Sequence, residues 1–327
     1  MSIKTYAMAI HDVMAEEMRR DERVFIMGED VETLGGVFGC TRDLYKEFGT
    51  ERVRNTPISE AGFVGAGIGA ACAGMRPIVE LMYMDFTFVA MDQLLNQAAK
   101  TRYIFGGNAR IPLVIRGQQG IGRGNAATHS QSVETFFMHI PGLKVACPST
   151  PADAAGLLRT AIRDDNPVMF FEHKALYAGK GEVPDDPDFS VPFGKADIKR
   201  KGTDVTIVAN LLYVGRALEA AEELAGEGIS AEVIDPRTLV PLDMSTITES
   251  VKKTGRLVVV HEAHRTAGWG AEIASQVTEE AFPYLDAAPL RLGTAACPLP
   301  FNLELEKAAT PQTADIIKAA KAVLYKE

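Results

Sequence analysis

The sequence alternates short apolar runs with longer segments of helical character. The runs at 23–28, 52–58, 77–84, 111–117, 144–149 and 168–174 are rich in Val, Ile and other apolar residues, and most end at Gly, Pro or a charge. Helical periodicity or capping residues mark three segments that lie between or beside these runs, at 6–18, 60–74 and 150–165. Continuous apolar runs are typical of parallel strands buried on both faces. The pattern therefore predicts an α/β fold with a doubly wound parallel sheet.

A change in composition predicts where this first domain ends. Residues 177–202 are rich in Pro, Gly and charge, and the alternation of strands and helices then resumes. We therefore expect two doubly wound α/β domains, at 1–178 and 204–327, joined by a linker at 179–203. The second domain has expected strands at 204–210, 230–235, 256–262 and 290–294, and expected helices at 216–225, 245–253, 271–281 and 313–325.

Charge and cysteine content narrow the classes of function. A net charge of -9 disfavours general nucleic-acid binding, because phosphate backbones favour basic surfaces. The cysteines at 40, 72, 147 and 297 form no CxxC pair, which argues against a structural zinc site or a disulfide framework. No apolar run approaches the ~18 residues of a membrane span. The amphipathic first segment does not resemble a signal peptide, so we expect a cytoplasmic protein, with an already mature organellar protein as the alternative.

Glu60 stands where a strand is expected to end and a helix rich in small residues begins. The surrounding residues are Ile58-Ser59-Glu60-Ala61-Gly62. Ligands of parallel α/β sheets bind at the carboxyl ends of strands, so Glu60 is expected to face a crevice. The glycines at 62, 65, 67 and 69 permit close approach of other backbone. The alternative is a glutamate that only stabilises a helix start.

A second candidate is His129, which follows a loop rich in glycine. Four glycines occur between 117 and 124, so the loop is expected to be mobile without a ligand. A histidine at its end suits acid–base chemistry near neutral pH, although a loop histidine can also serve only to bond backbone. His261 and His264 follow a strand without the HExxH spacing, so a zinc-protease site is disfavoured.

Together these residues resemble the beta subunits of 2-oxo acid dehydrogenases, which are transketolase-like thiamine-diphosphate enzymes. The matching stretches cover nearly the whole chain in the family's order: TPISEAGFVGAGIGAA, VELMYMDF, DQLLNQAAK, THSQSVETFFMHIPGLKV, AIRDDNPV and VIDPRTLVPLD. The resemblance implies a pyrimidine-binding domain followed by a transketolase C-terminal domain. The MYMDF, FGG and FEHKALY stretches resemble acetoin-dehydrogenase-type beta subunits more than mitochondrial pyruvate ones.

The resemblance also implies roles for particular residues. Glu60 would bond the pyrimidine of thiamine diphosphate and favour the imino tautomer, whose nitrogen removes the thiazolium proton. Met82 and Phe86 would contact the pyrimidine ring. His129 would line the channel to the thiazolium and help proton transfer as the acyl group passes to lipoamide. A potassium ion would be bound mainly through backbone carbonyls at Leu113, Ala161, Asp164 and Asn166.

One motif of the family is missing. The chain has Gly28-Glu29-Asp30 but neither the GDG sequence nor the Asn-Asn pair that bind diphosphate and Mg2+. The resemblance therefore implies half a site, completed by an alpha subunit in an α2β2 heterotetramer that docks on a lipoyl acyltransferase core. Pyruvate and acetoin are the favoured substrates. A branched-chain 2-oxo acid dehydrogenase beta subunit, a non-catalytic scaffold and a self-sufficient thiamine enzyme of another transketolase branch are the alternatives.

Overall fold

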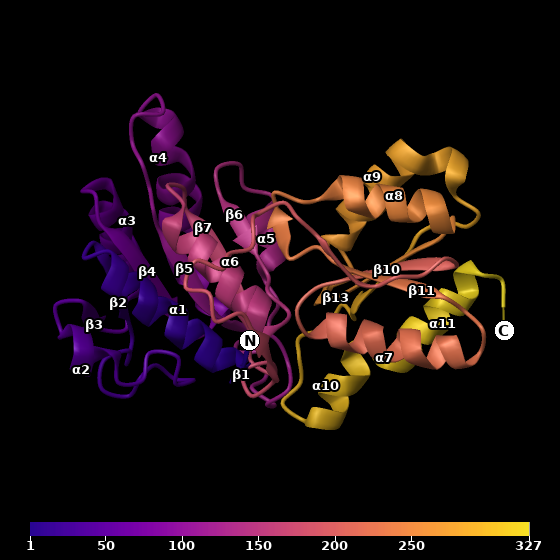
Figure 1. Cartoon of the computed structure of the whole chain (residues 1–327), viewed down its shortest axis with the longest axis horizontal. Helices are drawn as coiled ribbons and strands as arrows, with labels where there is room; N and C mark the ends of the chain where they lie inside the picture. The colour runs from indigo at the N-terminus through magenta and orange to yellow at the C-terminus, as the bar shows by residue number, and fades with distance from the viewer. Residues whose placement is uncertain (327) are drawn as a thin grey trace. The chain divides into compact units, whose positions relative to one another are not determined.

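The chain divides into two compact units in the computed structural model, which describes residues 1–326. One unit comprises residues 1–119 and 136–193, and the other comprises 120–135 and 194–327. Figure 1 shows the elements of both units. Among the described residues, no helix is long and apolar enough to cross a membrane.

The first unit is built on a parallel sheet with the strand order β6-β7-β5-β4-β2-β3. Its strands are β1 (Ser2–Thr5), β2 (Val24–Gly28), β3 (Val53–Asn55), β4 (Arg76–Leu81), β5 (Val114–Gln119), β6 (Lys144–Ala146), β7 (Val168–His173) and β8 (Lys180–Val183), of which β1 and β8 form a separate antiparallel pair. Its helices are α1 (Tyr6–Arg20), α2 (Leu44–Phe48), α3 (Glu60–Cys72), η1 (Met84–Ala90), η2 (Gln93–Ala98), α4 (Ala99–Ile104) and α6 (Pro151–Arg163), and α5 (Glu134–Met138) begins at its border.

Strand alternation determines which helices cover each face of this sheet. Ile26 and Ile78 point toward α1 and α6, with which they form one buried core. Val79, the next residue along β4, points to the opposite face, where it meets α3. Helix α6 begins at the predicted place, because the Thr150 side chain accepts the Asp153 N–H and Pro151 occupies the first turn.

The sheet of the first unit also buries a charged cluster. Arg116 on β5 is 1% exposed and donates to both carboxylate oxygens of Glu172, at 2.6 and 2.7 Å. It also donates to Glu80 on the neighbouring strand β4, and Tyr177 donates to Glu172 at 2.7 Å. A buried carboxylate is tolerated only when donors replace its water, so this cluster is structural in character.

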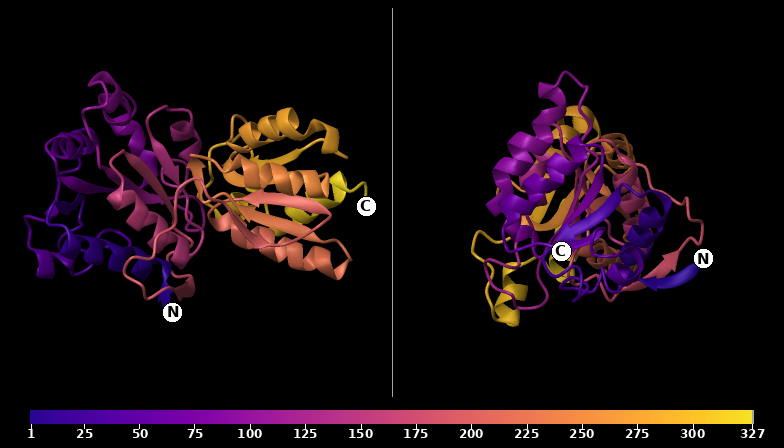
Figure 2. Two further views of the ribbon diagram at one scale, coloured as in Figure 1. Left: turned by 45° about the horizontal axis from the view of Figure 1, so that its top comes forward. Right: turned by 90° about the vertical axis from the view of Figure 1, so that its left-hand side faces the viewer.

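The second unit is a three-layer structure with the strand order β14-β13-β10-β11-β9. Its strands are β9 (Asp197–Arg200), β10 (Val205–Ala209), β11 (Ala231–Asp235), β12 (Thr238–Val240), β13 (Leu257–His264) and β14 (Leu290–Thr294), and its helices are α7 (Leu212–Gly226), α8 (Met244–Thr254), α9 (Gly270–Ala281), η3 (Phe282–Tyr284), α10 (Leu303–Ala309) and α11 (Thr313–Val323). Helices α8 and α9 cover one face of the sheet, and α7 and α11 cover the other (Figures 1 and 2). Only the edge strand β9 is antiparallel to its neighbour.

The structure confirms the α/β fold class and differs from the expected boundaries in two places. Residues 179–203, expected as a linker, contain β8, which pairs with β1, and β9, which extends the second sheet. Residues 120–135, expected in the first domain, belong to the second unit. Both differences arise from pairing between residues far apart in sequence, which the local composition does not encode.

The small residues of α3 generate a prediction about stability. A β-carbon at Gly67 would lie 2.7 Å from Val79 Cγ2, whereas one at Gly69 would have no atom within 4 Å. We expect Gly67→Ala to destabilise the chain by about 1–3 kcal/mol through overpacking. The control Gly69→Ala is expected to be neutral or to stabilise by up to about 1 kcal/mol, because Ala favours helix. Urea midpoints of the two variants measure this, and equal midpoints would contradict close packing at Gly67.

Candidate active site

The first unit brings four candidate side chains to one edge of its sheet. Glu29 follows β2, Glu60 begins α3 after β3, and Met82 and Phe86 follow β4. Strands β3, β2 and β4 are adjacent and parallel, so their carboxyl ends lie on the same edge. The chain crosses from one side of β2 to the other between β3 and β4, which makes the β2–β4 gap the topological switch point of the sheet. Ligands of such sheets bind in the crevice outside a switch point.

Glu60 is a buried carboxylate without a protein partner. It is 7% exposed and lies at the first position of α3, where the helix dipole favours a negative charge. Within residues 1–326 no hydrogen bond or ion pair to its carboxylate is present. A buried carboxylate normally accepts several hydrogen bonds, so this one is available to a donor on a bound molecule.

Glu29 is a second carboxyl group at this edge, and the sequence analysis did not identify it as a site residue. It is 4% exposed, and its Oε1 atom has no hydrogen-bond partner within the described chain. Burial, with the negative charges of Glu60 and Asp30, raises the pKa of Glu29 from 4.5 to about 7. An acidic pair directly after a buried strand was the signal that could have revealed it.

Met82 and Phe86 provide partly buried apolar surface next to these carboxyls. The backbone at Met82 is fixed, because Gln118 Nε2 donates to the Met82 carbonyl at 2.9 Å. The Phe86 ring packs edge-on against Tyr83, with the ring centroids 5.9 Å apart. The edge therefore combines two carboxyls with a thioether and an aromatic ring, a combination that suits a flat ring bearing a hydrogen-bond donor.

His129 lies in the second unit, not the first. It is partly buried, and its Nδ1 atom is 2.9 Å from the Thr128 hydroxyl. The neighbouring Ser130 is fully buried. The loop that precedes His129 was expected to be mobile, but two of its amides bond buried carboxylates of the second unit.

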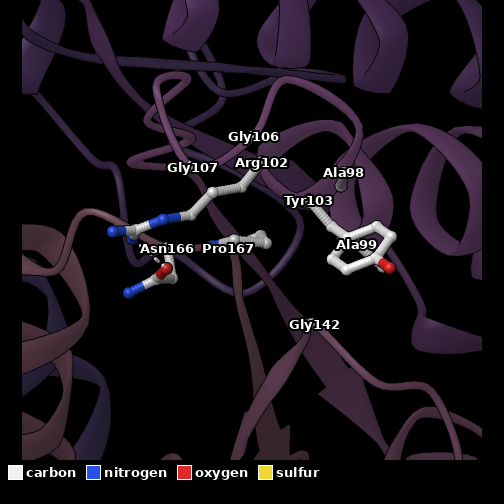
Figure 3. Close-up of a pocket in the computed structure, with 9 residues that line it drawn as sticks. All are labelled: Ala98, Ala99, Arg102, Tyr103, Gly106, Gly107, Gly142, Asn166 and Pro167. Atoms are coloured by element: carbon white, nitrogen blue, oxygen red, sulfur yellow. Dashed lines mark hydrogen bonds between the residues drawn. The ribbon is translucent and has the colours of Figure 1, made fainter.

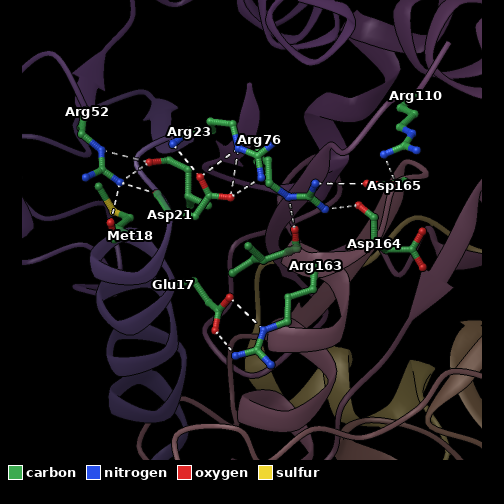
Figure 4. A network of polar contacts seen from close by, with 12 residues as sticks. Glu17, Met18, Asp21, Arg23, Arg52, Arg76, Arg110, Arg163, Asp164 and Asp165 are labelled. Atoms are coloured by element: carbon green, nitrogen blue, oxygen red, sulfur yellow. Dashed lines mark hydrogen bonds and ion pairs between the residues drawn. The ribbon is translucent and has the colours of Figure 1, made fainter. Parts of the chain in front are cut away.

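The four residues expected to bind potassium gather at the turn after α6. The Ala161 carbonyl accepts the Asp164 N–H at 3.3 Å, and the Leu113 carbonyl accepts the Val168 N–H at 2.8 Å. Arg76 donates to the Asp164 carbonyl at 2.7 Å and pairs with Asp165 (Figure 4).

The fourth residue, Asn166, is held by Asp164. The Asp164 carboxylate accepts from the Asn166 backbone and side chain at 2.8 and 2.7 Å. The bond to Lys144 and those to Asn166 hold the pKa of Asp164 below its usual value despite burial. Protein donors therefore close this turn, and each carbonyl retains a second lone pair. No cluster of three or more His, Cys, Asp or Glu that could hold a metal occurs in residues 1–326.

A separate pocket of about 450 Å³ opens beside this turn (Figure 3). Its lining residues are Ala98, Ala99, Arg102, Tyr103, Gly106, Gly107, Gly142, Asn166 and Pro167. Asn166 is the only predicted site residue among them, so this pocket is distinct from the Glu60 edge.

Two family models match the chain. The transketolase pyrimidine binding domain matches residues 3–180, and the transketolase C-terminal domain matches residues 194–316. A pyruvate dehydrogenase E1 component subunit beta of Rhizobium meliloti is 49% identical over all of this chain and 71% of its own length. The chain belongs to the transketolase-like, thiamine-diphosphate-dependent family of dehydrogenase beta subunits.

Other relatives of this family are similar at the same level. The acetoin:2,6-dichlorophenolindophenol oxidoreductase subunit beta of Cupriavidus necator is 50% identical, with 98% of this chain and 96% of that protein covered. A mitochondrial pyruvate dehydrogenase E1 beta-1 subunit of Arabidopsis thaliana is 46% identical over 97% of this chain and 88% of its own. A solved split gene transketolase, an inactive beta4 tetramer, has the same fold, with a TM-score of 0.80 at 23% identity over 98% of each chain.

The carboxyl pair generates a prediction about pH. The pKa of Glu29 is about 7 when folded and 4.5 in the unfolded reference, so the folded chain keeps a proton that the unfolded chain loses first. This group therefore lowers stability as pH rises from about 5 to about 7, and its effect is constant above that range. We expect the urea midpoint of Glu29→Gln to fall less over this interval than that of the native chain. Parallel pH profiles of the two proteins would contradict the assignment.

Proposed function

We propose that this chain is the beta subunit of a thiamine-diphosphate-dependent 2-oxo acid (pyruvate) or acetoin dehydrogenase. The enzyme would cleave the carbon–carbon bond next to a carbonyl and pass the acyl group to lipoamide of an acyltransferase. The observation that carries this proposal is the unpartnered buried carboxylate of Glu60 at the switch point of the first sheet. The names of the relatives, pyruvate dehydrogenase and acetoin oxidoreductase beta subunits, support it.

The side chains at the Glu60 edge fit the pyrimidine half of the cofactor. Thiamine diphosphate supplies a carbon nucleophile and an electron sink when it is bound. Glu60 would accept a hydrogen bond from a pyrimidine ring nitrogen, which the absence of a protein donor leaves it free to do. Met82 and Phe86 would contact the ring. Burial, together with the neighbouring charges of Glu60 and Asp30, raises the pKa of Glu29 to about 7, so Glu29 can hold a proton close to neutral pH.

We propose that His129 is the second catalytic residue and moves a proton during acyl transfer to lipoamide. Its position at the end of a glycine-rich loop and its partial exposure support this role. We also propose a potassium ion bound mainly through backbone carbonyls at Leu113, Ala161, Asp164 and Asn166. The remaining lone pairs at that turn support it, whereas the guanidinium of Arg76 bonded to the Asp164 carbonyl competes with it.

The diphosphate and Mg2+ would be bound mainly by an alpha subunit in an α2β2 heterotetramer, which docks on a lipoyl acyltransferase core. Two observations support a half-site: the missing GDG and Asn-Asn motif, and the beta-subunit names of the relatives. The acidic character of the chain suits a basic docking partner.

Reconstitution tests the proposal directly. The chain is assayed with its alpha subunit, thiamine diphosphate, Mg2+ and an artificial electron acceptor, with pyruvate, acetoin and a branched-chain 2-oxo acid in parallel. We expect turnover only when both subunits are present, with pyruvate or acetoin preferred. Turnover by the isolated chain would contradict the half-site, and a stable heterotetramer inactive on all three substrates would contradict the catalytic role.

Glu60→Gln tests the cofactor contact within that assembly. The amide removes the charge that stabilises the protonated ring nitrogen, so we expect turnover to fall by roughly 10²-fold or more while the fold is retained. Glu51→Gln, at a carboxyl whose side chain is 88% exposed, is the matched control and should retain native turnover. If turnover of Glu60→Gln stays near native, Glu60 does not activate the cofactor.

A further inference from the structure

The loop that carries His129 is closed upon itself and belongs to the second unit. We call residues 120–131 the histidine loop. Its two ends meet, because the Gly120 N–H donates to the Gln131 carbonyl at 3.1 Å. A compact loop with adjacent ends has the form of an Ω-loop, which holds its shape through its own contacts. Its attachment to the unit around it therefore decides where His129 lies.

Two buried carboxylates of the second unit bond consecutive amides of the histidine loop. Glu262, near the end of β13, accepts the Ile121 N–H at 2.8 Å and the Ser132 hydroxyl at 2.8 Å. Glu306, on α10, accepts the Gly122 N–H at 3.0 Å. The two residues are 6% and 2% exposed. Bonds from backbone N–H groups to a carboxylate are charge-assisted and stronger than those between neutral groups.

Glu306 depends on the loop for its hydrogen bonding. Its second oxygen, Oε1, is buried and has no partner within the described chain, and no ion pair to it occurs in residues 1–326. A buried carboxylate without donors is strongly unfavourable, so the bond from Gly122 stabilises both the loop and Glu306.

Backbone packing and a tryptophan hold the rest of the segment. A β-carbon at Gly124, where φ is +60°, would lie 2.7 Å from the Phe301 carbonyl oxygen, so the loop backbone packs directly on the segment before α10. After the loop, the Trp269 indole N–H donates to Glu134 at 3.2 Å, and the Trp269 backbone N–H donates to Thr135 at 3.2 Å. Anchors therefore lie on both sides of His129 in the sequence.

The histidine loop is anchored where a separate α/β domain would bind a ligand. Strand β10 has β11 on one side and β13 on the other, so the chain reverses direction across the sheet at the β10–β13 gap. The crevice outside such a gap is the usual ligand site of the fold. Here Glu262, at the carboxyl end of β13, accepts the Ile121 N–H and the Ser132 hydroxyl of this chain in place of a ligand.

We propose that Glu262 and Glu306 are positioning residues that hold the histidine loop on the carboxyl edge of the second sheet and so orient His129 for acyl transfer. The second unit would then serve catalysis by carrying this loop, without a small-molecule site of its own at that edge. The proposal rests on the proposed function in one respect, namely the role of His129 in transfer to lipoamide.

The first measurement is hydrogen exchange in the full-length chain. We expect the Gly122 amide to exchange at least about tenfold faster in Glu306→Ala than in the native chain, because its acceptor is lost. Glu304→Ala is the matched control, since Glu304 lies on the same helix with its side chain 81% exposed and pairs with Lys307. In Glu304→Ala the amides of the histidine loop should exchange at the native rate. Unchanged exchange in Glu306→Ala would overturn the anchoring.

The second measurement compares two rates in the assembly with the alpha subunit. In Glu306→Ala we expect the rate of acyl transfer to lipoamide to fall about tenfold or more, as in His129→Ala. The rate with an artificial electron acceptor should fall much less. If Glu306→Ala does not fold, Glu262→Gln, which keeps the side-chain size, replaces it. This variant should also lower the ratio of the lipoamide rate to the rate with the artificial acceptor. A native ratio in both variants would overturn the positioning role. If the native assembly shows neither rate, the proposed function is contradicted. Hydrogen exchange of the loop amides then still tests whether Glu306 anchors the loop.

Discussion

The desolvation of carboxylates is the constraint on which the architecture of this protein depends. Several glutamates are buried, most of them at or near the carboxyl ends of parallel strands and one on α10. Water is excluded there, so each carboxyl group must accept hydrogen bonds from protein donors or keep its proton. Glu80 and Glu172 find Arg116. Glu262 and Glu306 find amides of the histidine loop. At the Glu60 edge no donor within residues 1–326 bonds the carboxylate, and the pKa of Glu29 rises to about 7.

Both units have a switch point at the carboxyl edge of their sheet, but only in the second unit does the chain itself cover that edge. In the first unit that edge presents the carboxylate of Glu60 without a protein donor, and this is the feature of a site awaiting a ligand. In the second unit the corresponding edge is occupied by residues 120–135 of the same chain. Under the proposed function, the first unit would provide one half of a cofactor site and the second unit would carry the loop of His129.

The regular elements were predicted well from the sequence because their signals are local. Apolar runs and capping residues predicted the parallel strands, and Thr150 and Pro151 predicted the start of α6, which the structure confirms. Residues 179–203, expected as a linker, contain β8 and β9, whose pairing with distant strands the local composition does not indicate. Glu29 was missed since its raised pKa depends first on burial and then on the charge of Glu60, which is 31 positions away in the sequence.

The sequence by itself determined the α/β class, the two-unit organisation, the family and the position of Glu60 at a strand-to-helix junction. Each of these follows from periodicity or from short motifs, which are properties of neighbouring residues. Only the tertiary structure decided that Glu60 has no donor in the described part of the chain, that Glu29 shares its edge and that the histidine loop belongs to the second unit. The physical reason is that burial and hydrogen-bond satisfaction depend on which distant segments meet, and a linear pattern does not record this.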